Sequence, residues 1–63
     1  MTPLEYLRQV RLEHAHRELL AGDPARQTVT SVAYRWGFPS PGRFSAYYRR
    51  TYGVSPSQTL RNQ

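Results

Sequence analysis

The sequence predicts an all-α fold in which two short helices joined by a tight turn follow one long helix and precede a short one. Three observations predict it. Hydroxyl residues able to cap a helix stand before four segments, glycines follow three of these segments, and no stretch shows the alternating pattern of a strand. The chain has 63 residues, 38% of them hydrophobic, which allows a single small domain with a thin core.

The first helix is predicted over residues 3–21. Thr2 can accept a hydrogen bond from the first turn while Glu5 bonds back to it, and Pro3 is suited to the first helical position. The apolar residues of this helix form two roughly opposite stripes, with Leu7 between them, where a surface helix needs one. We interpret this as a helix held between two bodies; the alternative is a few stray surface apolar residues. The main stripe contains Leu4, Leu12, Ala15 and Leu19, and the second stripe contains Tyr6, Val10, Leu20 and Ala21.

Caps and glycines mark the remaining helices. Thr28, Ser40 and Ser55 are candidate caps, and proline follows the last two at the first helical position. Gly37 and Gly53 can end the second and third helices in the left-handed conformation. The predicted order is a loop over 22–28, a helix over 29–36, a turn over 37–40, a helix over 41–52 and a short helix over 56–61.

The core is predicted from residues that share a helix face. Phe44 and Tyr48 are four positions apart, so they lie on one side of their helix, and rings at this spacing are usually core. Trp36 fits the rim of the core and its interior equally. Arg11 falls within the main stripe of the first helix, so we expect a structural arginine with a packed stem and a paired head. The predicted core consists of Leu12, Ala15, Leu19, Val32, Ala33, Phe38, Phe44, Tyr48, Tyr52 and Val54.

Charge is distributed unevenly along the chain. The net charge is +5, and all nine basic residues are arginine. Residues 1–23 hold three arginines against four acids, whereas residues 24–63 hold six arginines and no acid. Such asymmetry is typical of a surface that binds nucleic acid or another anionic partner, and the alternative is a solvated basic face.

Fixed spacings connect the turn, the two rings and the exit of the third helix. The motif reads Val29-x-x-Val32-Ala33-x-x-x-Gly37-Phe38, then Phe44, Tyr48 and Gly53-Val54-Ser55-Pro56, and Pro3, Tyr6-Leu7, Arg11-Leu12 and Ala15 precede it. This pattern resembles the linking helix and second helix-turn-helix of the AraC/XylS family of bacterial transcription regulators. The resemblance implies a partial DNA-binding domain over 1–63, with a linking helix over 1–22, a helix-turn-helix over 28–53, and a short helix and tail over 54–63.

The two ends of the chain also resemble each other. Residues 1–8 read MTPLEYLR and residues 54–61 read VSPSQTLR. Members of the family carry two helix-turn-helix units joined by a long helix, usually with a separate effector-binding domain, so we expect a chain that lacks the first unit and the effector domain. The implied partners are double-stranded DNA at an operator or promoter, RNA polymerase, and the missing first unit and effector domain of the parent protein.

The resemblance also implies which residues touch DNA. In the family, the recognition helix lies in the major groove and reads bases from its first turns. Arg43 is the natural bidentate donor here, to guanine O6 and N7, and Ser45 can add a weaker contact. The implied base contacts are Pro41, Gly42, Arg43, Ser45 and Ala46. The expected phosphate contacts are Ser40, Arg35, Tyr47, Arg49 and Arg50, with solvated charge as the alternative for the arginines.

Other classes of function are disfavoured. His14 and His16 are two positions apart, so on a helix they point about 200° from each other and do not form a metal pair. We expect no metal, no cofactor, no catalysis, no membrane span and a cytoplasmic location. The competing hypothesis is a helical protein-interaction module that docks a partner on the second stripe of helix 3–21. Binding to duplex DNA at low salt separates the two hypotheses.

Overall fold

The computed structural model describes residues 1–61, and these form four α-helices without a strand. The all-α prediction is therefore confirmed for the described part of the chain. Residues 62–63, which belong to the predicted C-terminal tail, lie outside the described residues. The helices are α1 (Pro3–Ala21), α2 (Val29–Arg35), α3 (Pro41–Tyr52) and α4 (Pro56–Arg61).

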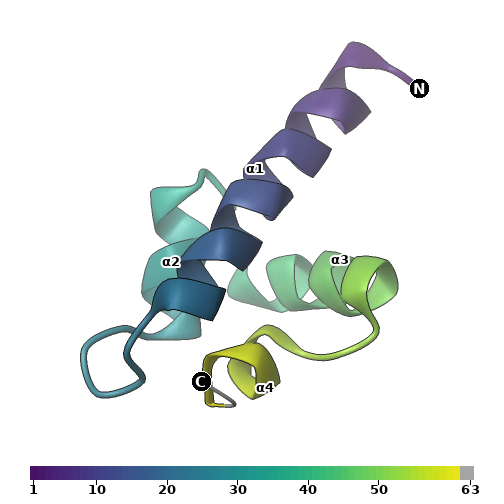
Figure 1. Ribbon diagram of the computed structural model, residues 1–63. Coiled ribbons are helices and arrows are strands. Elements are labelled where there is room, and N and C mark those ends of the chain that lie inside the picture. Colours follow the sequence, from purple (N-terminus) through teal and green to yellow (C-terminus); the bar gives the residue numbers. More distant parts are fainter. Residues whose placement is uncertain (62–63) are drawn as a thin grey trace.

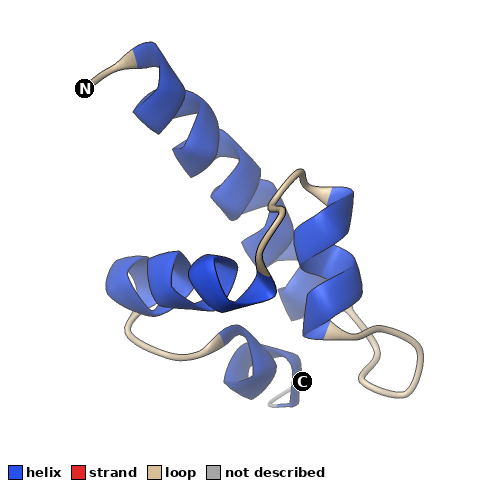
Figure 2. Cartoon of the chain, turned by 180° about the vertical axis from the view of Figure 1, so that it is seen from behind, coloured by secondary structure: helices blue, strands red, loops and turns tan. Residues whose placement is uncertain are grey.

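The long helix α1 is a rod against which the other three helices are assembled (Figure 1). Its backbone lies close to α2 and α4, as does the backbone of α3. Side chains of α1 also reach α3, where His16 Nδ1 lies 2.6 Å from the Tyr48 hydroxyl. All buried residues of α1 lie from Leu12 onward, so its N-terminal half extends beyond the body of the domain, as the view from behind also shows (Figure 2). The molecule is consequently elongated, with extents of 36 × 21 × 19 Å.

Side-chain caps start all four helices, as the sequence predicts. Each hydroxyl accepts a hydrogen bond from a backbone N–H three residues later, which satisfies a donor that the helix itself leaves unpaired. In α1 and α2 the bond is reciprocated by the side chain of the third helical residue. The N–H groups of Glu5, Ser31, Arg43 and Gln58 donate to Thr2, Thr28, Ser40 and Ser55 over 3.1, 3.1, 3.3 and 3.1 Å.

The turn between α2 and α3 begins one residue earlier than predicted. Helix α2 ends at Arg35, and Trp36 is its C-cap, with φ −95° and ψ 16°. Gly37 then adopts φ 84°, and the N–H of Phe38 donates to the carbonyl of Ala33 over 2.9 Å. Only glycine takes this left-handed conformation without strain, so Gly37 both ends α2 and aims the chain toward α3.

The core is a single cluster that joins all four helices. Its rings pack in tilted pairs: Phe38 against Phe44 with centroids 5.0 Å apart, and Phe44 against Tyr48 at 5.9 Å. Tyr52 packs against this cluster while remaining half-buried. The buried members are Leu12, Ala15, Leu19, Val32, Ala33, Phe38, Phe44, Tyr48 and Leu60, and the first eight of them were predicted from the sequence.

Two differences from the predicted core have a common cause. Val54 is exposed, because the left-handed residue Gly53, at φ 80°, turns the chain away from the face of α3. The turn instead brings α4 under the core, where Pro56, Thr59 and Leu60 are buried although the sequence pattern gives no sign of it. The short last helix is therefore part of the core, which was not predicted.

A polar chain crosses this core at Tyr48. Its hydroxyl donates to Thr59 Oγ1 over 2.8 Å and lies 2.6 Å from His16 Nδ1, so it connects α1, α3 and α4. The His16 ring also stacks on Tyr52, with centroids 3.9 Å apart. Because Tyr48 is fully buried, these partners supply the hydrogen bonds that water would otherwise make.

Tyr48 makes the stability of the fold sensitive to alkaline pH. Burial raises the pKa of Tyr48 above its usual value, with the hydrogen bond to Thr59 opposing this in part. The unfolded chain releases this proton near pH ~10, while the folded chain still holds it, so the free energy of unfolding falls as the pH rises beyond that point. Urea melts at pH 8 and above pH 10 should show this loss, and Tyr48→Phe should reduce its slope. Tyr34→Phe, at an exposed position, is the control; an equal effect of both variants would contradict the assignment.

Candidate nucleic-acid interface

Helix α3 presents two contrasting sides. Phe44 and Tyr48 are fully buried, as predicted, and this fixes the rotation of the helix. Of the predicted base contacts, Gly42, Arg43 and Ala46 are exposed. Pro41 and Ser45 are half-buried, as are the predicted phosphate contacts Ser40 and Tyr47, whereas Arg49 and Arg50 are exposed. The outer side of α3 is therefore small and polar near its start and cationic toward its end.

The start of α3 is open enough for close approach of another molecule. The Ser40 hydroxyl oxygen accepts from the N–H of Arg43, while its own O–H can still donate. A Cβ added at Gly42 would find only Ser40 Oγ within 4 Å, at 3.9 Å, so packing within the fold does not require glycine here. The absent side chain leaves the helix backbone accessible at this position.

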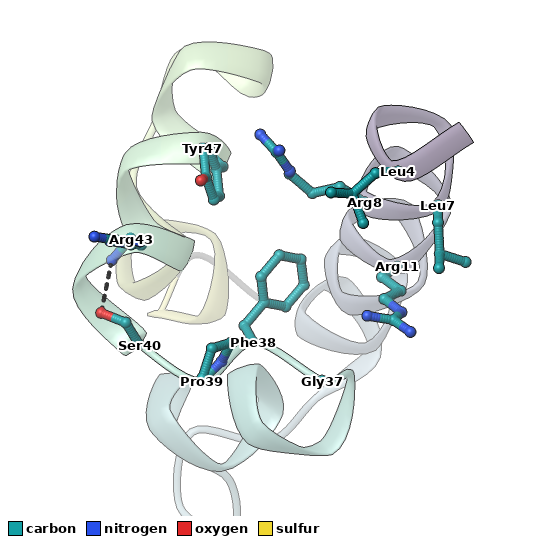
Figure 3. A pocket seen from close by; sticks show the side chains of 10 residues that line it. All are labelled: Leu4, Leu7, Arg8, Arg11, Gly37, Phe38, Pro39, Ser40, Arg43 and Tyr47. Carbon is teal, nitrogen blue, oxygen red and sulfur yellow. Dashed lines mark hydrogen bonds between the residues drawn. The ribbon is translucent and has the colours of Figure 1, made fainter. Parts of the chain in front are cut away.

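A cavity of about 320 Å³ lies between the first half of α1, the turn and the start of α3 (Figure 3). Arg8 of α1 lies over the ring of Tyr47, with its guanidinium carbon 4.5 Å from the ring centroid. This contact ties the projecting half of α1 to the outer side of α3. The lining residues are Leu4, Leu7, Arg8, Arg11, Gly37, Phe38, Pro39, Ser40, Arg43 and Tyr47.

Arg11 differs from its prediction. It is exposed, and within residues 1–61 its guanidinium has no hydrogen-bond or ion-pair partner, so the expected paired head is wrong. The guanidinium lies alongside Gly37, where an added Cβ would meet Nη1 at 3.3 Å. Arg11 is exposed although it belongs to the main stripe of α1, because the body of the domain covers this helix only from Leu12 onward.

Glu18 of α1 collects three donors from the segment around α2. Arg35 forms an ion pair with it, Trp36 Nε1 donates to Oε2, and Gln27 Nε2 donates to Oε1 over 3.4 Å. The Trp36 ring stacks on His14 with centroids 5.0 Å apart and is half-buried, which places Trp36 at the rim of the core. Sequence reasoning missed this carboxylate because its partners are up to 18 positions away.

The arginines divide into paired and unpaired groups. Arg17 pairs with Glu13 at 2.6 Å, Arg26 with Asp23 at 3.9 Å, and Arg35 with Glu18. No carboxylate among residues 1–61 pairs with the arginines of α3, which are Arg43, Arg49 and Arg50. Three of the six arginines without a carboxylate partner among residues 1–61 are therefore on α3, and Arg8, Arg11 and Arg61 on α1 and α4 are the others. The positive charge on the outer side of α3 can be neutralised by an external anion.

The described residues offer little for other kinds of site. No group of three histidine or acidic side chains in this part of the chain could hold a metal ion. No helix within residues 1–61 has the length and hydrophobicity needed to cross a membrane. The histidines have structural partners instead, since His14 stacks on Trp36 and His16 contacts Tyr48.

Comparison with known proteins bears directly on this arrangement. Residues 1–62 match a family model described as a helix-turn-helix domain. The chain belongs to the AraC/XylS family. The resemblance predicted from the Gly-Phe turn, the ring pair and the Ser-Pro exit is therefore confirmed at the level of the family.

Relatives of this AraC/XylS domain are regulatory proteins by name. The chain is 48% identical over 60 residues to the probable thc operon regulatory protein of Rhodococcus erythropolis, covering 95% of this chain and 18% of that protein. It is 39% identical over 62 residues to XylDLEGF operon transcriptional activator 1 of Pseudomonas putida, covering 98% and 19%. It is 35% identical over 63 residues to the transcriptional activator RhaS of Pectobacterium atrosepticum, covering 100% and 21%.

The chain thus spans about a fifth of the length of these three relatives. No solved structure matches the chain significantly. The names of these relatives describe regulators and activators of transcription, not enzymes.

Proposed function

We propose that this AraC/XylS domain binds double-stranded DNA in a sequence-specific way as part of a bacterial transcription regulator, with α3 in the major groove. The observation that carries the proposal is the rotation of α3. The rings of Phe44 and Tyr48 are buried, so Gly42, Ala46 and the unpaired arginines of the helix are exposed on the other side. A helix of this kind fits the width of the major groove and matches its negative charge. The function also places the protein in the cytoplasm, where bacterial operators lie.

In this proposal some residues of α3 contact base edges of the DNA and others contact its phosphates. Gly42 and Ala46 are small, so the helix can approach the base edges closely, and Arg43 between them reaches guanine. Pro41 and Ser45 are half-buried and contribute at the edge of this surface. The proposed phosphate contacts are Ser40, Tyr47, Arg49 and Arg50. Arg35 was also expected to contact phosphate, but its guanidinium forms an ion pair with Glu18.

A salt titration of binding to duplex DNA tests the proposal. If Arg49 and Arg50 neutralise about two phosphates, a plot of log K against log salt concentration should have a slope of about −1.8. Preference for particular sequences should persist as salt is raised, because base contacts do not release counterions. No binding to any duplex at about 50 mM salt would exclude the proposed function.

Arg49→Ala should weaken binding about equally on all sequences and reduce the magnitude of the salt slope by about one unit, because Arg49 is proposed to contact only phosphate. The measurement is the salt titration of the variant on two unrelated duplexes. Arg17→Ala removes the same charge from an arginine that is paired with Glu13, so it serves as the matched control. A slope that stays at the value of the unaltered protein would remove Arg49 from the interface.

A second candidate function is favoured by the surface of α1. Tyr6 and Leu20 of the predicted second stripe are 55% and 49% exposed, and Leu7 is 44% exposed. We propose that this stripe packs against the rest of the parent protein, namely the first helix-turn-helix unit and the effector domain, or against RNA polymerase. In isolation the chain should then self-associate through α1, and sedimentation of the chain and of Tyr6→Glu tests this. A clean monomer for both would argue against it.

A further inference from the structure

Glu18 differs from every other acid of the chain. The sequence contains four acidic residues, and Glu18 is the one whose residue is not exposed; its side chain is 19% exposed. Its three partners come from separate segments: Gln27 from the loop, Arg35 from the end of α2 and Trp36 from the cap of α2. The carboxylate therefore sits where α1 meets the first helix of the helix-turn-helix.

Two of these partners hold the carboxylate in place without Arg35. The indole N–H of Trp36 donates to one oxygen and the amide of Gln27 to the other. Arg35 adds charge to a site that is already ordered, and its own side chain remains 51% exposed. The guanidinium could thus reach an external anion, but leaving Glu18 would strand a carboxylate with little access to water.

We propose that Glu18 is an internal competitor for DNA phosphate: it holds Arg35 against α1 and keeps this arginine out of the DNA interface. A carboxylate and a phosphate offer a guanidinium the same bidentate geometry, so one excludes the other. Glu18 is then the residue that sets how many phosphates the domain contacts. The inference rests on the proposed DNA binding and adds to it a residue that lies outside α3.

Glu18→Gln tests the proposal because it removes the negative charge while keeping an oxygen that can accept from Trp36. Released from its ion pair, Arg35 should join the interface. The salt slope should then steepen by about 0.9, and binding at about 50 mM salt should tighten roughly tenfold relative to the control. The control is Glu13→Gln, which makes the same change in net charge on the same helix, at an acid that pairs with Arg17. If Glu18→Gln changes the slope no more than Glu13→Gln does, the proposal is wrong.

Arg35→Gln in the otherwise unaltered chain is a second test that does not depend on the first variant. Because Arg35 is already paired with Glu18, this substitution should leave the salt slope unchanged. Arg17→Gln, at an arginine paired with Glu13, should leave it unchanged as well. Combined with Glu18→Gln, it should return the steepened slope to the value of the unaltered protein. A fall of about one unit in the slope for Arg35→Gln alone would show that Arg35 contacts phosphate despite Glu18, and would overturn the proposal.

Trp36 supplies a readout of folding in each of these variants. It is the single tryptophan of the chain, so its indole N–H gives one resonance that reports on the contact with Glu18. On addition of DNA to the unaltered protein this resonance should stay in place, since the site around Glu18 does not open. Absence of DNA binding by the unaltered protein would count against the proposed function itself, whereas binding with equal slopes for the two glutamate variants would count only against the role of Glu18.

Discussion

Phe44→Ala should leave the domain largely unfolded at 25 °C. The Phe44 side chain is fully buried between Phe38 and Tyr48, so its removal opens a cavity at the centre of the core. Such truncations cost about 3–5 kcal/mol. A domain of 63 residues has a total stability of about 3–9 kcal/mol at typical values per residue, so the loss is comparable to the whole. Far-ultraviolet circular dichroism with urea and thermal melts measures the effect.

Tyr34→Ala provides the matched control for this substitution. It also truncates an aromatic residue of a helix to alanine, but at a position that is 57% exposed. Its effect should stay within about 0.5 kcal/mol. If Phe44→Ala melted like Tyr34→Ala, the ring would not be part of a packed core, and the assignment of the outer side of α3 would lose its basis.

Arg43→Ala should cost about 1–3 kcal/mol of binding free energy on a preferred DNA site and remove the preference at one G·C pair. Arg43 is exposed in the first turn of α3 and has no carboxylate partner within residues 1–61. Its guanidinium is therefore free to donate two hydrogen bonds to guanine O6 and N7. Titrations on a preferred duplex and on variants at each position measure both the loss and the change in preference.

The pattern of losses distinguishes a base contact from a phosphate contact. A base contact at Arg43 predicts a large loss on the preferred duplex and a small one where the guanine is replaced. Arg49→Ala, with its proposed phosphate contact on the same helix, should instead show equal losses on all duplexes. Equal losses for Arg43→Ala as well would move Arg43 to the phosphate contacts and leave the domain without a strong base contact.

The helices could be predicted closely because their signals are local. A hydroxyl cap, a proline and a glycine act within three or four residues, and the bounds of α1, α3 and α4 agree with prediction. The one shift is at the end of α2, where Trp36 is the C-cap, with φ −95° and ψ 16°, and precedes the left-handed Gly37. The buried rings of α3 were likewise predictable, since Phe44 and Tyr48 repeat at the period of the helix.

The remaining features depend on contacts between distant segments. The burial of Thr59 and Leu60 follows from where Gly53 sends the chain, and the contact of His16 with Tyr48 spans 32 positions. Likewise, the ion pair of Glu18 removes Arg35 from the group of unpaired arginines, although both residues look like surface charges in the sequence. The number of charged residues could be counted from the sequence, but which of them form ion pairs could not be predicted from it.

The positive side of α3 consists of arginine alone, since the chain contains nine basic residues and no lysine. Guanidinium groups stay charged throughout the range of pH in which proteins are folded. Acetylation, which silences lysine-rich surfaces by removing the charge of an amine, has no side chain to act on within these 63 residues. The positive charge of this surface therefore does not change with pH or by lysine acetylation. Ionic strength, which screens the charge, is the simplest condition that changes its attraction for a polyanion.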